Sequence, residues 1–228
     1  LCKARIPIRI GSAYRAYSFL FNNRVREHRK DCKYHEITYN LHLLQALELK
    51  IDWLTPKLFP PIDAISSAKK IISEKSIDEK TFIIIHPGSR GSSLKWSASK
   101  FRELVILLHK NNVKYLITSG EGEYDLAKYV ANGNESVIIG GIDIKTLGAL
   151  YSMASVIVAP NTGVLHLADA VGTKVLGIYP VLLTTSALRW GPANYPQGAL
   201  SPEIELHRKC QKKCQNYPCT DKINPELV

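Results

Sequence analysis

The sequence of 228 residues contains no apolar run long enough to cross a membrane, and its first residues lack the pattern of a signal peptide. Internal repeats and low-complexity tracts are also missing. The five cysteines are an odd number without a secretion signal, which favours a reducing cytoplasm over a framework of disulfides. The chain begins at Leu1 with residues typical of the middle of a domain, so we expect a preceding segment in the native protein.

Acidic residues are scarce near the N-terminus. The whole chain holds 30 basic and 20 acidic residues, but residues 1–33 hold nine Lys or Arg against Glu27 and Asp31. This concentrated field favours an anionic partner, whether phosphorylated lipid, acidic membrane surface or nucleic acid, over a merely solubilising face. Interleaved aromatic residues fit a protein at a headgroup layer, and equally a small core beside a solvated loop. The cations that we expect to face an acidic acceptor or a membrane are Arg15, Arg24, Arg26, Arg29 and Lys30.

Strands and helices alternate regularly from Thr81 onward. That order predicts an α/β fold with a doubly wound parallel sheet, in which ligands bind at the carboxyl ends of the strands. We divide the chain into residues 1–62, a linking helix and turn at 63–80, and the α/β region at 81–228. The predicted strands are 3–10, 81–86, 113–118, 137–139, 155–159 and 174–179, and the predicted helices are 34–49, 63–75, 97–112, 123–132, 144–154 and 164–172.

The stretch from Ala154 to Gly172 is the most informative part of the chain. A buried-strand pattern leads into the turn Asn161-Thr162-Gly163, and a helix follows. The first amides of that helix lack internal partners, and the helix dipole attracts anions to them. The stretch therefore fits a phosphate site and, equally, an ordinary turn that binds nothing. His166 fits a donor to a phosphate or sugar oxygen, or a structural histidine bonded to a backbone carbonyl.

Two other strand ends carry glycine and polar residues. The loop His86 to Trp96 contains Ser89, Arg90 and Lys95, which suit a pyrophosphate, although it is neither a Walker loop nor Gly-x-Gly-x-x-Gly. The next strand ends at Gly120, and Glu123 there fits a ribose ligand or a carboxylate favoured by the helix dipole. Because these ends open on one side of a parallel sheet, together they favour a nucleotide-diphosphate site.

Near the C-terminus, Cys210, Cys214 and Cys219 follow His207. Three cysteines and a histidine suit zinc, but the spacing is not that of a paired C-x-x-C knuckle. We therefore expect loop packing here and no metal.

These motifs jointly resemble glycosyltransferase family 9, the heptosyltransferases of bacterial lipopolysaccharide synthesis. The resemblance covers nearly the whole chain. It is carried by His86-Pro87-Gly88-Ser89 with Lys95-Trp96, by Gly120-x-x-Glu123, by Asn161-Thr162-Gly163-x-x-His166, and by the cysteine-rich end closing in Ile223-Asn224-Pro225-Glu226. The N-terminal stretches Ile6-Pro7-x-Arg9-Ile10-Gly11, Leu20-Phe21-Asn22 and His35-Glu36 resemble that family too.

The resemblance implies a GT-B fold of two Rossmann-like domains, with residues 81–228 as the nucleotide-sugar domain and residues 1–62 as the later part of the acceptor-side domain. It implies inverting transfer of heptose from ADP-heptose to the phosphorylated lipid A-core acceptor, without metal or cofactor and without nucleic acid. The enzyme would be cytoplasmic or peripheral on the inner face of the inner membrane. Ser89 and Lys95 would face the diphosphate, Glu123 the ribose, and the amides of Thr162 and Gly163 the phosphates.

The sequence departs from the family pattern in two places. Asn161 stands where the family usually has Asp, which leaves the donor sugar open, and no residue matches the family's Asp base. Two rival functions remain: another GT-B nucleotide-sugar transferase or epimerase, and a non-catalytic basic module that binds anionic membrane or nucleic acid.

Overall fold

The computed structural model describes residues 3–49, 52–91, 93–210, 214 and 217–228. The chain divides into two compact units. Unit 1 comprises Leu1–Leu54 and Leu188–Trp190, and unit 2 comprises Thr55–Ala187 and Gly191–Val228. Among the helices of the described ranges, none combines the length and the apolarity needed to cross a bilayer.

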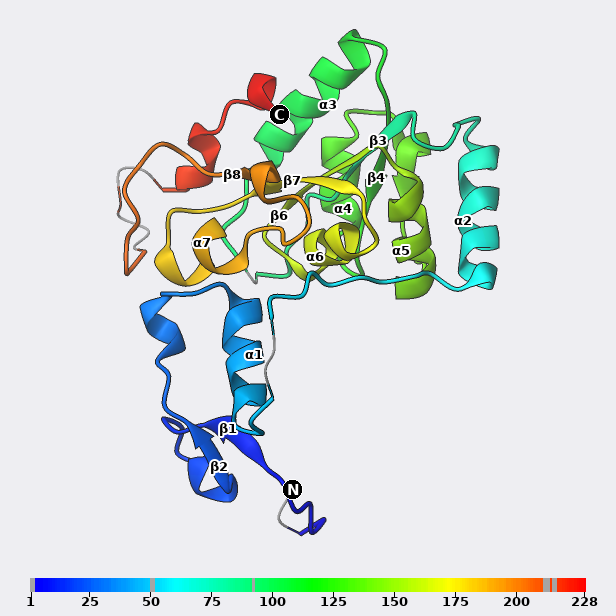
Figure 1. Cartoon of the computed structure of the whole chain (residues 1–228). Helices are drawn as coiled ribbons and strands as arrows, with labels where there is room; N and C mark the ends of the chain where they lie inside the picture. Colours follow the sequence, from blue (N-terminus) through cyan, green and yellow to red (C-terminus); the bar gives the residue numbers. More distant parts are fainter. Residues whose placement is uncertain (1–2, 50–51, 92, 211–213, 215–216) are drawn as a thin grey trace. The chain divides into compact units, whose positions relative to one another are not determined.

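Unit 2 is organised around a parallel sheet whose described strands run in the order β5-β4-β3-β6-β7-β8 (Figure 1). The chain enters this sheet at the central strand β3, continues outward through β4 to β5, and then returns to β6 and continues to the opposite edge. That reversal makes the sheet doubly wound, and it places a topological switch point between β3 and β6. The strands are β3 (Phe82–Ile85), β4 (Lys114–Thr118), β5 (Ile138–Ile139), β6 (Val156–Pro160), β7 (Lys174–Ile178) and β8 (Ala199–Leu200).

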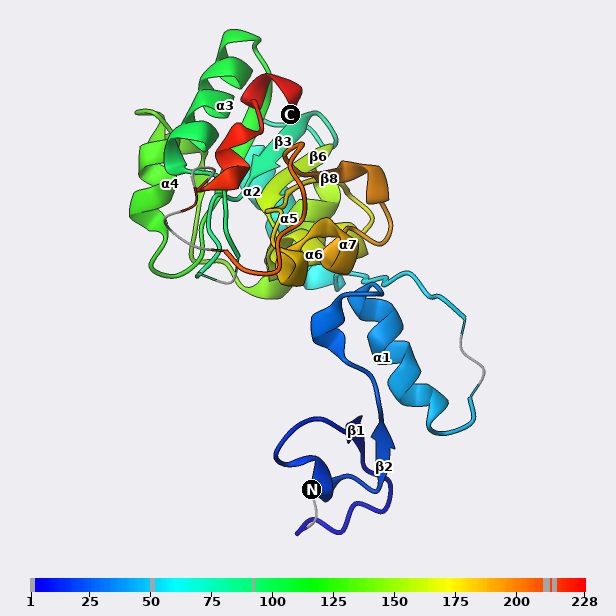
Figure 2. The same ribbon diagram turned by 90° about the vertical axis from the view of Figure 1, so that its left-hand side faces the viewer.

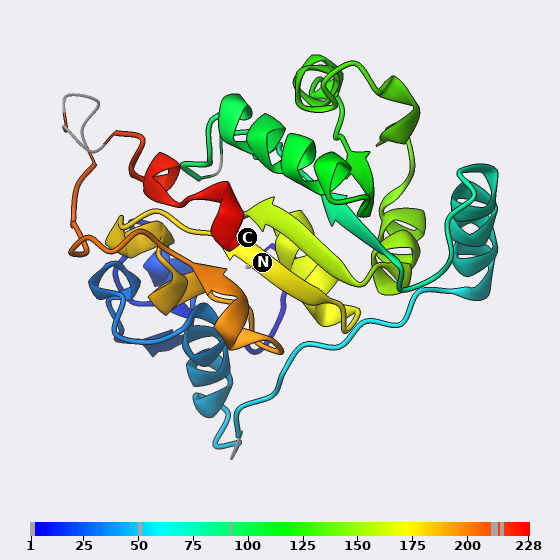
Figure 3. The same cartoon turned by 90° about the horizontal axis from the view of Figure 1, so that it is seen from above.

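Helices cover both faces of this sheet, as the view from above shows (Figure 3). Helices α3 and α4 contact each other along one face, while α2 packs against α5 and α5 against α6 on the other. Each apolar helix stripe is thereby removed from water against the sheet. The helices of this unit are α2 (Ile62–Glu74), α3 (Ala98–Lys110), α4 (Tyr124–Val130), α5 (Ile144–Met153) and α6 (Gly163–Ala170), while α7 (Ala187–Trp190) begins in unit 2 and continues in unit 1.

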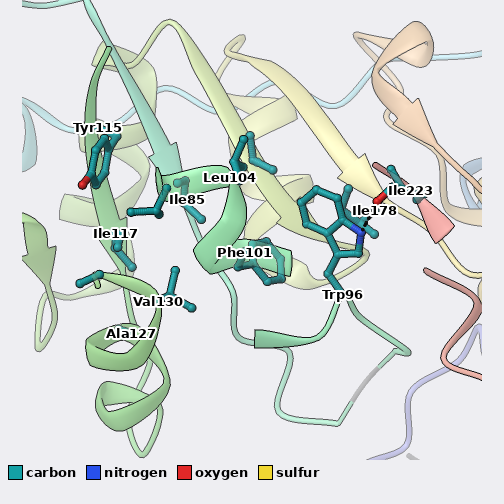
Figure 4. Packing of buried hydrophobic residues seen from close by; sticks show 13 residues of the cluster. Ile85, Trp96, Phe101, Leu104, Tyr115, Ile117, Ala127, Val130, Ile178 and Ile223 are labelled. Atoms are coloured by element: carbon teal, nitrogen blue, oxygen red, sulfur yellow. Dashed lines mark hydrogen bonds between the residues drawn. The ribbon is translucent and has the colours of Figure 1, made fainter. Parts of the chain in front are cut away.

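The strands are apolar on both faces because both faces are covered. Ile85 and Ile117 belong to a cluster with Phe101 of α3 and Val130 of α4 (Figure 4). Ile84, one residue before Ile85, is equally inaccessible but lies outside this cluster, as the two-residue period of a strand requires. Full burial of one such side chain stabilises the fold by about 1.5–3 kcal/mol.

The C-terminal segment of the chain packs beside α3 (Figure 2). The indole N–H of the fully buried Trp96 donates to the Ile223 carbonyl at 3.1 Å, and Asp221 accepts from the Ser97 amide at 2.7 Å. Ser97 also caps α3, because its hydroxyl accepts from the Lys100 amide. The last residues of the chain thus hold the loop that leads from β3 into α3.

Unit 1 contains a parallel pair of short strands, β1 (Ile10–Ser12) and β2 (Asn23–Val25), and helix α1 (Glu36–Gln45), which contacts β1. Glu36 lies between two arginines: one carboxylate oxygen pairs with Arg29, and the other accepts from Arg189 at 2.8–2.9 Å. Because Glu36 is only 9% exposed, this carboxylate depends on both cations to compensate for its lost hydration.

The structure confirms the α/β prediction and changes it in detail. Every predicted strand and helix from residue 81 to 179 is present, with shifted ends. The strand predicted at residues 3–10 is wrong, because β1 begins only at Ile10. Instead, the backbone amide of Arg9 donates to the Asn22 side chain, and its guanidinium donates to the Leu20 carbonyl. The contact division between units falls after Leu54, and α2 packs on α5 within unit 2; the three-part domain assignment itself stays a prediction.

Candidate functional site

The carboxyl ends of β3, β4 and β6 lie at one edge of the sheet of unit 2. Strand β3 pairs with both neighbours in parallel, and the His86 amide, just past β3, donates to the Val158 carbonyl of β6 at 2.9 Å. The loops after these three strands therefore start side by side. They carry the residues that the sequence analysis assigned to a donor site.

The loop after β6 presents the beginning of helix α6. Thr162 is the N-cap of α6, yet its side chain makes no capping hydrogen bond. Its hydroxyl oxygen is buried and has no partner among the described residues. A methyl group built on Gly163, the first helical residue, would meet nothing within 4 Å. This helix end therefore combines unpaired donors with open space, as an anion site requires.

Asn161 and His166 lie on either side of that helix start. The Asn161 side chain donates to the Thr185 carbonyl at 2.9 Å and is only 8% exposed, so it holds the loop after β7. His166 is half-buried on the first turn of α6. The structure thus gives Asn161 a structural bond, and its role in donor binding stays a prediction.

The loop after β3 begins with a buried histidine. His86 is 5% exposed; its Nδ1 lies 3.0 Å from the Thr118 hydroxyl of β4, which lies 3.2 Å from the Tyr151 hydroxyl. Burial lowers the pKa of His86 to about 4; the Glu123 carboxylate opposes this shift, and Lys95 and Arg90 add to it. His86 is therefore neutral near pH 7 and acts as a hydrogen-bonding group rather than a cation.

Glu123 lies across the loop after β3. One carboxylate oxygen accepts from the Arg90 amide at 3.1 Å, and the other lies 3.8 Å from Nε2 of His86. A methyl group on Gly88 would fall 2.1 Å from that second oxygen, so the absence of a side chain there is what admits the carboxylate. The sequence left Glu123 as a ribose ligand or as a carboxylate favoured by the helix dipole, and the family resemblance implied the ribose. The structure shows that Glu123 ties the loop after β4 to the loop after β3, and the ribose contact stays a prediction.

Two cations, Arg90 and Lys95, flank this arrangement. The Arg90 guanidinium lies over Gly120, and both cations act electrostatically on His86. Ser89 of the same loop is buried. The Lys95 carbonyl accepts from the Thr220 hydroxyl at 2.8 Å, so the C-terminal segment fixes the backbone from which the Lys95 side chain projects.

Sequence reasoning missed the role of His86, which it quoted only as part of a motif. The available signal was positional: His86 and Thr118 are polar residues that end otherwise apolar strands. Adjacent parallel strands bring such terminal polar residues together, and a buried polar residue needs a partner.

The cations predicted to face an acceptor or membrane belong to unit 1. The structure brings Arg29 into the ion pair with Glu36, and its guanidinium also donates to the Tyr39 carbonyl and the Asn40 side chain. Arg24 donates to the Phe21 carbonyl at 3.1 Å and is exposed. The other exposed members of this set are Arg15, Arg26 and Lys30.

The cysteine-rich segment shows no preformed metal centre in the part of the chain that the structure describes, where no group of three or more His, Cys, Asp or Glu is arranged around an ion. Cys210, Cys214 and Cys219 are free thiols.

Comparison with known proteins adds a family. The model of glycosyltransferase family 9 (heptosyltransferase) matches residues 1–220. A putative glycosyltransferase of Haemophilus influenzae is 25% identical over 204 residues, covering 84% of this chain and 59% of that protein. The lipopolysaccharide core heptosyltransferase OpsX of the same organism is 24% identical, covering 97% of this chain and 63% of that protein. The chain thus spans less than two thirds of the length of these two relatives.

A solved structure shares the fold. The Escherichia coli ADP-heptose lipopolysaccharide heptosyltransferase II superposes with a TM-score of 0.70 at 15% identity, covering 98% of this chain and 68% of that protein. The predicted fold class, α/β of GT-B type, is thereby confirmed.

Proposed function

Because the chain belongs to glycosyltransferase family 9, we propose that it is part of an enzyme that transfers heptose from ADP-heptose to the lipopolysaccharide inner core with inversion. Relatives named as lipopolysaccharide heptosyltransferases support the sugar and the acceptor. The name of the E. coli neighbour, an ADP-heptose lipopolysaccharide heptosyltransferase, supports the donor.

The start of helix α6 is the observation that carries the proposal. The Thr162 hydroxyl is a buried donor without a partner among the described residues, and Gly163 leaves the adjoining amides open to close approach. A buried polar group without a partner costs about 1–3 kcal/mol, so this atom is best explained by a bound ligand. The partial positive charge of the helix start makes an anionic ligand the favoured one, and we assign a donor phosphate to it.

Positive charge for the diphosphate comes from the neighbouring loop. Lys95 and Arg90 lie near His86, which stays neutral and adds no charge of its own at pH 7. Two cations and a helix start stabilise the negative charge that develops on a departing nucleoside diphosphate. We propose that this set acts without a metal or cofactor, and that Glu123, held at the edge of the same site, accepts from the ribose.

Unit 1 suits an acidic acceptor. Arg15, Arg24, Arg26 and Lys30 are exposed there, and exposed cations attract phosphorylated sugars and anionic surfaces. We propose that they face phosphorylated lipid A-core at the inner face of the inner membrane, whereas Arg29 serves mainly to compensate Glu36. Two alternatives keep a specific basis: another nucleotide sugar, because Asn161 replaces the usual Asp, and a non-catalytic anion-binding module, because of the same cations.

Calorimetric titration with ADP, UDP, GDP and ADP-heptose tests the proposal. We expect selective binding of the ADP compounds. Thr162→Val removes one hydrogen bond to a charged group, worth about 1.5–3 kcal/mol, and so weakens ADP binding roughly 10- to 100-fold. Gly163→Ala should fold normally and still weaken ADP binding, because its methyl group is harmless to the protein but obstructs a phosphate.

Gly148→Ala supplies the matched control. Gly148 lies in α5, where a methyl group would meet Leu167 at 3.4 Å, and its replacement should leave ADP affinity unchanged. Equal affinity of the Thr162→Val, Gly163→Ala and unmodified proteins for ADP would refute the phosphate assignment. Salt-sensitive binding of nucleic acid without any nucleotide response would favour the anion-binding module.

A further inference from the structure

Unit 2 contains a cavity that the proposed donor site does not use. Its volume is about 240 Å³, and it opens between the loop before α3, the residues after β7 and the cysteine-rich segment. The walls are mainly apolar. The lining includes Leu94, Leu182, His207, Cys210, Cys214 and Cys219.

Three of the five cysteines of the chain line this cavity. Cys210 and Cys214 are exposed, whereas Cys219 is only 7% exposed. Desolvation raises the pKa of the Cys210 thiol, and the neighbouring Cys219 and then Cys214 raise it further, so both lie close enough to act on it. An accessible thiol therefore stands beside a sheltered one.

Of Cys210 and Cys219, Cys219 is held in place by its neighbours in the sequence. The next residue, Thr220, donates to the Lys95 carbonyl at 2.8 Å, and Asp221 accepts from the Ser97 amide. Cys210, by contrast, belongs to an exposed stretch of the chain. A covalent bond between the two would fasten that stretch to the backbone that carries Lys95.

We propose that Cys210 and Cys219 form a thiol–disulfide exchange site that reacts with small disulfides such as oxidised glutathione. The thiolate of Cys210 attacks one sulfur of the small disulfide and releases one small thiol. The thiolate of Cys219 then attacks the sulfur of Cys210 in the mixed disulfide and releases the second. Two protein thiols and one small disulfide thus become one protein disulfide and two small thiols, which carry away both hydrogens.

The test uses a chain in which Cys2 and Cys32 are replaced by serine, so that only the three cavity thiols remain. The protein is incubated with oxidised glutathione, labelled with a maleimide and mapped by mass spectrometry. We expect the loss of two of three labels, with Cys214 still labelled and Cys210 linked to Cys219. The rate should rise as the pH is raised toward the thiol pKa, because only the thiolate attacks.

Unfolded protein supplies the control. In concentrated urea, loop closure favours the shorter pairings that involve Cys214, because shorter loops lose less chain entropy on closing. Pairing of Cys210 with Cys219 only in the folded protein supports the proposal. Cys214→Ser should retain the bond, and Cys219→Ser should stop at a glutathione adduct of Cys210.

Three results would overturn this assignment. One is the same pairing pattern in folded and unfolded protein, and another is retention of all three labels. The third is protection of all three thiols by equimolar Zn²⁺, which would make the cluster a metal site. Thiol counting needs no glycosyl transfer, so its result is independent of the proposed function.

Discussion

Buried His86 makes a defined prediction for the pH dependence of stability. In the unfolded chain its pKa has the ordinary value of 6.5, whereas in the folded protein burial lowers the pKa to about 4. Between these values the unfolded state binds more protons, so the free energy of unfolding falls as the pH falls. The penalty begins near pH 6.5, reaches about 2 kcal/mol by pH 5, and is about 3 kcal/mol at pH 4.

Urea unfolding of the unmodified protein and of His86→Gln, followed by circular dichroism from about pH 7.5 down to pH 5, measures this term. Near neutral pH the variant should be less stable, because it loses the contact with the Thr118 hydroxyl. The gap between the two proteins should then narrow by about 2 kcal/mol toward pH 5, since glutamine has no proton to gain. Replacement of the exposed His109 controls for loss of a histidine as such. Parallel pH profiles for the unmodified protein and His86→Gln would refute the reasoning.

Three further predictions concern neighbouring contacts. Gly88→Ala should displace the Glu123 carboxylate and lower the free energy of unfolding by about 1.5–3 kcal/mol. In a protein that already carries Glu123→Ala, the same substitution should cost nothing further. Additive losses in this double-mutant cycle would contradict the contact between Glu123 and the loop after β3. Asp169→Asn should destabilise unit 2 by about 2–4 kcal/mol in urea unfolding, because this buried carboxylate accepts from consecutive backbone amides; a loss below 0.5 kcal/mol would exclude that role. Trp96→Phe should lower the free energy of unfolding by about 1–3 kcal/mol, because the Ile223 carbonyl loses its donor. Faster hydrogen exchange of the backbone amides around Ile223 would confirm that the C-terminal segment has loosened, and unchanged exchange would contradict it.

The sequence was sufficient for the α/β architecture because its strands are apolar on both faces and its helices carry apolar stripes. Those patterns are local, and they match the structure from β3 to β7. Short elements were missed. Strand β8 has two residues, and α7 has four, too few for either periodicity to appear. Strand β5 is as short as β8, but the regular alternation of strands and helices around it predicted it.

The candidate site was predictable as a set of loops but not as a set of contacts. Parallel topology alone brings the loops after β3, β4 and β6 to one edge. The position of the Glu123 carboxylate against Gly88 could only be seen in the structure. The two residues are far apart in the sequence, and neither residue type indicates that the other is its partner. Arg29 shows the same limit, since a cation in a basic run has no signature of its bond with Glu36.

Asp169 sits at the opposite end of α6 from Thr162 and gathers the backbone of the loop that re-enters unit 2. Its carboxylate accepts from the Ala193, Asn194 and Tyr195 amides. The Asn194 side chain donates to the carbonyl of Pro56, one residue after the chain first enters unit 2. The two segments by which the chain enters unit 2, at Thr55 and at Gly191, are therefore both hydrogen-bonded around the end of one helix. A shortened chain that holds unit 2 alone should therefore begin before Pro56 and keep residues 191–195, because α6 would otherwise lose these hydrogen bonds.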